Sequence, residues 1–228
     1  MTAAATPHPV SALGPYFALR LGSVPPPDHR PLDALFTDGI AVRVREVAER
    51  LRTTEPRVAA SVVQLGLAAR FWSVTLGSLA VTGEIPELDR VHWHQPPDGP
   101  LDLWLPTGAG TTTDPCAVLT TVLAPLDAAV RAATPVAERL LRGNAASALV
   151  GTLRVMHGQL AATAPAAYRA AEQAARTLLA HPRLAGTLTP DGPRLRRTTC
   201  CLYYRLPAGG LCGDCVFDTA PAGPGLAG

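Results

Sequence analysis

The sequence contains no lysine, so all 20 of its basic residues are arginines. The absence of lysine indicates a compositional bias of the genome and does not point to a function. Charged residues make up only 17% of the chain, against about 25% in an average protein. The formal net charge is +2, too small to attract nucleic acid or an anionic membrane as the main partner. We therefore expect neither of these partners.

Long uncharged apolar runs are also missing. The longest stretch without Asp, Glu, Lys or Arg is residues 1–19, which contain three prolines and no basic region ahead of a continuous apolar core, so they do not resemble a secretory signal. A later uncharged stretch, residues 71–83, is shorter than the roughly 18 apolar residues of a membrane span. These features predict a cytoplasmic protein with no membrane span, and they leave open peripheral attachment at the inner face of the cell membrane.

The amount of glycine and proline, 20 and 23 residues respectively, falls short of a disordered composition. Hydrophobic residues make up 47% of the chain, which is enough for a sizeable core. The length favours a single domain, with or without an appended module. The sequence shows no internal repeat of the period typical of solenoids or propellers.

Helical spacing dominates the chain. Thr54-Glu55-Pro56 predicts a helix start, apolar residues then recur at steps of four and three from Val58 to Leu79, and Gly83 is the expected stop. Pro125 is expected to split a helix that follows Asp114-Pro115. Further helices are predicted over 34–51, after Thr134-Pro135 and over 165–179.

A β-hairpin is predicted over 91–105, where apolar and polar residues alternate around a Pro-Pro-Asp-Gly turn. His92 and His94 share one face of it, and with no third ligand nearby a solvated face is favoured over a metal site. The N-terminal segment, 1–30, is predicted to be loop. The fold class is therefore mainly α, a helical single domain with a small β-hairpin.

The cysteines carry the chemistry. Four of the five lie close together near the C-terminal end of the chain, at Cys200, Cys201, Cys212 and Cys215. In a reducing compartment, clustered cysteines favour metal ligation over disulfides, and four thiolates complete an iron–sulfur cluster or a zinc site. Both adjacent cysteines can face one centre only if the backbone leaves the regular strand conformation there. The spacing C-C-x10-C-x2-C disfavours zinc, whose structural sites usually pair ligands at C-x2–4-C spacing in both halves.

This segment resembles the [2Fe-2S] motif of the FhuF-type ferric-siderophore reductases. The resemblance rests on the cysteine spacing, the arginines just before Cys200, the run Tyr203-Tyr204-Arg205-Leu206-Pro207 and the tetrapeptide Cys212-Gly213-Asp214-Cys215. A weaker match, Gly143 to Leu149, is similar to a helix-start segment of those proteins.

The resemblance implies one [2Fe-2S] cluster with the four C-terminal cysteines as its ligands. It implies an oxidoreductase of iron homeostasis that reduces Fe(III) in imported ferric siderophores by single electrons and releases Fe(II) in the cytosol. The fold then comprises a helical body over residues 1–192, a C-terminal [2Fe-2S]-binding module over 193–217 and a flexible tail over 218–228.

The cluster needs compensating charge and an electron source. Arg196, Arg197 and Arg205 are placed to offset its negative charge, and we expect Arg197 and Arg205 in particular beside it. No Gly-x-Gly-x-x-Gly follows a strand. The reductant is therefore expected to be separate, such as a ferredoxin, a flavodoxin or a flavin reductase.

Simpler roles are favoured for three further residues. Cys116 is expected to be a buried, inert thiol, Trp72 a core residue and Asn144 a cap where two helices abut. Two other functions stay open at this point: an iron–sulfur carrier or sensor without a siderophore substrate, and a zinc-stapled interaction module.

Overall fold

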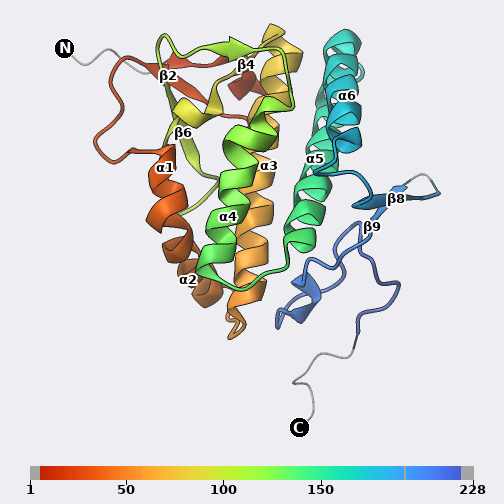
Figure 1. Cartoon of the computed structure of the whole chain (residues 1–228). Helices are drawn as coiled ribbons and strands as arrows, with labels where there is room; N and C mark the ends of the chain where they lie inside the picture. Colours follow the sequence, from red (N-terminus) through yellow and green to blue (C-terminus); the bar gives the residue numbers. More distant parts are fainter. Residues whose placement is uncertain (1–5, 193, 222–228) are drawn as a thin grey trace.

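The fold is mainly α-helical, as predicted. The computed structural model describes residues 6–192 and 194–221. Figure 1 shows the longer helices side by side, with most strands toward one end of the bundle and the last strand pair and the C-terminal segment beside the opposite end of α5. The helices are α1 (Leu32–Ala34), α2 (Ile40–Arg50), α3 (Pro56–Thr82), α4 (Ala124–Ala133), α5 (Glu138–Leu160) and α6 (Pro165–Ala180).

Helix α3 forms the centre of the bundle and has the predicted ends. Pro56 occupies its first turn, where no intrahelical N–H bond is lost, and Gly83 ends it with a left-handed φ of 78°. The helix is long and apolar enough to cross a membrane, but 78% of its most apolar window is buried inside the protein. Trp72 is fully buried and donates to the Ala145 carbonyl at 2.9 Å. It is the core residue that the sequence predicted, and it joins α3 to α5.

A buried arginine ties α3 to the strands. Arg70 is only 1% exposed and donates to the carbonyls of Leu101 and Tyr16, both at 2.7 Å, and to the carbonyl of Ala18. Burial lowers its pKa to about 10, so the guanidinium stays charged at neutral pH. The three carbonyls compensate for that buried charge and fix the N-terminal segment against the helix.

The predicted hairpin forms within a larger sheet. β5 (His92–His94) and β6 (Asp102–Pro106) pair antiparallel, with His92 opposite Trp104. The sheet has the strand order β1-β2-β6-β5-β3, so the prediction of loop over the N-terminal segment, 1–30, is wrong in part. β1 (Thr6–Pro7), β2 (Arg20–Gly22) and β3 (Arg30–Pro31) are too short to show a period of two in the sequence.

Two smaller strand pairs complete the fold. β4 (Ile85–Pro86) pairs with β7 (Thr111–Thr112), and β8 (Leu188–Asp191) pairs with β9 (Arg194–Arg197). β9 leads directly into the cysteine segment, and its last backbone N–H, at Arg197, donates to the Asp214 carbonyl at 2.9 Å. This bond draws the far end of the cysteine segment back to the strand.

The helix starts in the middle of the chain differ partly from the prediction. The helix after Asp114-Pro115 is split as expected: a π-helical turn over Leu119–Leu123 gives way to α4, which has a proline in its first turn. α5 begins at Glu138, beyond Pro135 and the two residues that follow it. The segment from Gly143 to Leu149 therefore lies inside a helix and not at its start, and Asn144 is not a cap.

Candidate metal centre

The four C-terminal cysteines come together beside the N-terminal ends of α3 and α5. The thiols of Cys201 and Cys212 are hydrogen-bonded to each other, Cys212 also contacts Cys215, and Cys200 interacts electrostatically with both Cys212 and Cys215. Cys116 lies elsewhere, in the turn after Asp114, where its backbone N–H donates to the Asp114 carboxylate at 2.9 Å. The structure thus gathers the four cysteines of the C-C-x10-C-x2-C spacing and separates the fifth.

The adjacent cysteines lie outside any strand, and the chain turns at the residue that follows them. Leu202 has a left-handed φ of 68°, a conformation that costs a non-glycine residue roughly 1 kcal/mol. In this conformation its backbone N–H donates to the Cys200 sulfur at 3.2 Å. The backbone N–H of Phe217 likewise donates to the Cys215 sulfur at 3.5 Å. Such N–H···S bonds stabilise thiolates and help to set the potential of an iron–sulfur cluster.

Burial makes these thiols costly to ionise without a metal. It is the largest influence on Cys200 and Cys215 and raises the pKa of both. In the Cys201–Cys212 pair, the shared hydrogen bond lowers the pKa of Cys201 and raises that of Cys212, because one thiolate accepts from the other thiol. Metal binding requires thiolates and supplies the positive charge that stabilises them. Cys116 is half-buried and not buried as expected, but burial followed by Asp114 raises its pKa, which agrees with an inert thiol.

Arg197 supplies the matching positive charge. Its side chain is 1% exposed, and one terminal nitrogen donates to the Asn144 side-chain oxygen. Its Nε and its other terminal nitrogen have no hydrogen-bond partner among the described residues. The same guanidinium opposes the burial and hydrogen bonding that raise the pKa of Cys200 and Cys212, and it helps the Cys212 hydrogen bond to lower the pKa of Cys201. A buried cation with unpaired donors near these three thiols fits a [2Fe-2S] cluster, whose oxidised four-thiolate form carries a charge of about −2.

Asn144 and Ser61 hold the cysteine segment on the helices. Asn144, in α5, donates to the carbonyl and the hydroxyl of Ser61 in α3 at 3.1 and 3.0 Å. The Ser61 hydroxyl donates to the Cys201 carbonyl at 2.7 Å. All three residues are buried. The expectation of a cap at Asn144 is thus replaced by a polar network, and Ser61 carried no sequence signal because it looks like any small residue of a core helix.

The other two arginines before and within the segment are paired. Arg205 donates through Nε to both oxygens of Glu55, at 2.8 and 3.0 Å. Arg196 pairs with Asp191 at 3.1 Å and with Asp218 at 2.6 Å, so the first residue of the predicted tail is tied to β9. Residues 222–228 of that tail lie outside the described residues. Among these arginines, Arg197 is the one with buried donors that have no partner in the described chain, and the closeness of Arg205 to the cluster stays a prediction.

Close packing at Gly143 yields a testable prediction. A Cβ atom there would collide with the Thr199 hydroxyl and come within 3.4 Å of the Arg197 side chain. Gly143→Ala is therefore expected to push the cysteine segment off α5, lower the free energy of unfolding by about 1–3 kcal/mol and speed cluster loss. Denaturant unfolding and the decay of visible absorption measure the two effects.

Gly158 gives the matched control in the same helix, because a Cβ there meets no atom within 4 Å. Gly158→Ala is expected to stabilise the protein by about 0.5–1 kcal/mol through helix propensity and to leave cluster decay unchanged. Equal behaviour of the two variants would contradict the packing argument.

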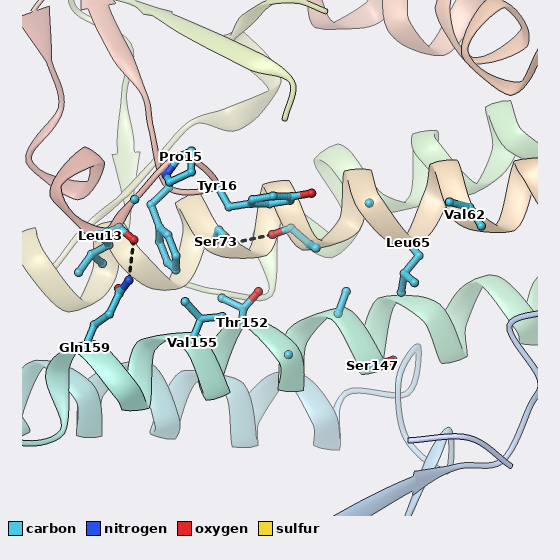
Figure 2. Close-up of a pocket in the computed structure, with 16 residues that line it drawn as sticks. Leu13, Pro15, Tyr16, Val62, Leu65, Ser73, Ser147, Thr152, Val155 and Gln159 are labelled. Carbon is cyan, nitrogen blue, oxygen red and sulfur yellow. Dashed lines mark hydrogen bonds between the residues drawn. The ribbon is translucent and has the colours of Figure 1, made fainter. Parts of the chain in front are cut away.

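Two surface hollows differ in their relation to the cysteines. The larger, of about 570 Å³, is an apolar groove between α3, α5 and the segment around Tyr16 (Figure 2). No charged residue, cysteine or histidine lines it within the described chain. The second, of about 460 Å³, has Cys200 in its wall together with Arg57 and Arg139. Size alone would select the groove, but the smaller pocket is the one that contains a cysteine of the C-terminal segment.

The histidines of the hairpin lie away from the cysteines. His94 Nδ1 is 3.6 Å from the Asp28 carboxylate and its ring is 5.5 Å from the His29 ring, while His92 packs edge-on against Trp104. Within residues 6–192 and 194–221, no three His, Cys, Asp or Glu side chains stand in metal-ligating geometry. The four cysteines therefore lie in one segment, with Cys212 hydrogen-bonded to Cys201 and Cys215, without forming a metal-ligating arrangement.

Comparison with known families agrees with this geometry. Residues 197–217 match the family model described as the FhuF 2Fe-2S C-terminal domain. A search of curated proteins finds no match. The protein is an iron–sulfur protein, and its cofactor is a [2Fe-2S] cluster. The C-terminal segment is of the FhuF type, which confirms the resemblance noted in the sequence; the match does not extend into the helical body.

Proposed function

We propose that the protein is a ferric-siderophore reductase, an oxidoreductase that acts on a metal ion. The observation that carries the proposal is the position of Cys200, which belongs to the FhuF-type segment and also lines a pocket open to the surface. A chelate in that pocket would lie against a ligand of the cluster. The reaction is a one-electron reduction of chelated Fe(III). The chelator has a lower affinity for the Fe(II) that forms, so the iron is released.

Each part of the centre has a stated task in this proposal. The four C-terminal cysteines ligate the cluster, which when bound supplies single electrons. Arg197 offsets its negative charge, and Arg205 adds a smaller contribution. Asn144 and Ser61 keep the cysteine segment seated on the helices through the Cys201 carbonyl. In this division, residues 1–192 are the body, 193–217 the cluster module and 218–228 the tail.

The partners follow from the chemistry. A ferric siderophore is the substrate, and a separate ferredoxin, flavodoxin or flavin reductase restores the electron. The reaction takes place in the cytoplasm, where imported siderophores arrive. Peripheral association with the inner face of the membrane is compatible with it and not required by it.

A stoichiometric reduction assay tests the proposal. Anaerobically pre-reduced protein is mixed with a ferric hydroxamate siderophore in the presence of a ferrous-specific chromogenic chelator. The cluster transfers one electron at a time, so each reduced cluster is expected to yield about one trapped Fe(II) as its oxidised absorption returns. Failure with hydroxamate, catecholate and citrate chelates, while the cluster stays intact, would favour an electron carrier or sensor instead.

A further inference from the structure

The pocket beside Cys200 is built from four parts of the chain. They are Arg57 at the start of α3, the start of α5 with the residues before it, the segment from Thr198 to Leu202, and the pair Val216 and Phe217. Of the four C-terminal cysteines, Cys200 alone lines the pocket. Its volume of about 460 Å³ lies within the roughly 300–1,000 Å³ typical of small-molecule sites.

The side chains around this pocket carry positive charge, which together with that of Arg197 exceeds the charge of about −2 on the oxidised cluster. Arg57 and Arg139 both line it. Arg57 shares the single carboxylate of Glu55 with Arg205, so these three groups together keep one excess positive charge. Arg139 is exposed, and no ion pair to it is formed within the described residues. Nearby Glu138 is engaged by Arg131 and Arg142, so it does not offset the charge of Arg139.

We infer that this pocket binds the ferric chelate and selects chelates that carry negative charge, such as tris-catecholate or citrate complexes, over neutral and cationic ones. The inference rests on the proposed function and names the substrate class of the same site. Arg57 and Arg139 contact the anionic chelate, and the Cys200 sulfur is the point where one electron leaves the cluster. The Fe(III) of the chelate takes up that electron and becomes Fe(II); no covalent bond is made or broken and no proton moves.

Binding is tested separately from reduction with gallium(III), which has the charge of Fe(III) but accepts no electron. The oxidised holoprotein is titrated by calorimetry with the trianionic gallium(III) complex of a tris-catecholate chelator and with a cationic gallium(III) trihydroxamate. Arg57→Gln and Arg139→Gln are each expected to weaken binding of the trianion by about five-fold, with smaller effects at higher salt. Arg154→Gln is the matched control, because Arg154 is exposed on α5 and about 22 Å along the helix from Arg139.

A second variant tests the pocket without changing its charge. Ala137 lines the pocket, is exposed, and has a φ of −65° that any residue adopts. Ala137→Trp is expected to fill the pocket and reduce binding of the trianion at least ten-fold while the visible spectrum of the cluster stays the same. Unchanged affinity in Ala137→Trp, or equal affinity of wild type for the two gallium complexes, overturns the inference.

The two proposals fail in different ways. If gallium binding shows the predicted pattern but no Fe(II) is trapped from ferric chelates, the binding pocket is supported and the reductase function is wrong. If ferric chelates oxidise the reduced cluster equally fast in wild type and in the Arg57→Gln/Arg139→Gln double variant, reduction stands and the pocket inference is wrong.

Discussion

Cys201→Ala and Cys212→Ala are each expected to abolish the visible absorption of the purified protein, whereas Cys116→Ala leaves it unchanged. Cys201 and Cys212 are hydrogen-bonded to each other at the middle of the gathered thiols, so loss of either removes a ligand that the remaining chain does not replace. Cys116 lies after Asp114, in another part of the fold. Visible spectra and iron content of the three variants, purified without oxygen, measure the effect.

The alternative interpretation as a zinc site is tested by the same variants. If the wild type is colourless and contains stoichiometric zinc that Cys212→Ala loses, the ligand set is right but the bound metal is zinc. A result in which Cys116→Ala bleaches the protein while one of the four others does not would show that the ligand set itself is wrong.

Arg197→Met is expected to lower the midpoint potential of the cluster by about 90 mV. A unit charge held at roughly 8 Å in a medium of effective dielectric near 20 contributes about 2 kcal/mol, and about 59 mV corresponds to a factor of ten for one electron. Reduction makes the cluster more negative, so removal of a positive charge disfavours the reduced form and lowers the potential. Square-wave voltammetry of wild type and variant gives the shift directly.

Two comparison variants separate the contributions of Arg197. Arg197→Lys keeps the charge but loses the planar set of donors, so its potential is expected to lie between those of wild type and Arg197→Met. Arg205→Ala is expected to lower the potential by only some tens of millivolts, because Glu55 already pairs with Arg205. The shift from Arg205 shrinks with added salt since that residue is less buried, while the shift from Arg197 does not. A potential that rises in Arg197→Met, with the cluster intact, places the guanidinium away from the cluster.

The parts of the fold that the sequence predicted well have strong local signals. α3 has a proline at its start and a glycine at its end, and both fix the backbone without help from the rest of the chain. The hairpin has a regular alternation over enough residues to show a period of two. The cysteine segment was identified because the spacing of its four cysteines and the residues around them form a specific local motif.

The parts that the sequence did not predict depend on distant partners. Arg70 lies among apolar residues of α3, and its three carbonyl acceptors come from two other segments. Asn144 resembles a cap because it is followed by helical spacing, yet its partners Ser61 and Arg197 lie far away along the chain. Nothing local distinguishes such residues, because tertiary packing overrides the local preference.

Arg57 and Arg139 show the same limit at the pocket proposed to bind the substrate. They are far apart in the sequence, and neither belongs to the cysteine motif. Only the packing of α3 and α5 against the cysteine segment brings both beside Cys200. A sequence motif can therefore identify the cofactor, while the surface that receives the substrate depends on the fold.

The central claim is that the four C-terminal cysteines hold a [2Fe-2S] cluster, and quantification of iron and acid-labile sulfide in the anaerobically purified protein tests it most directly. The account predicts a red-brown protein with about two iron and about two sulfide per chain, bleached by Cys212→Ala and unaffected by Cys116→Ala. A colourless protein with stoichiometric zinc and no sulfide would contradict it.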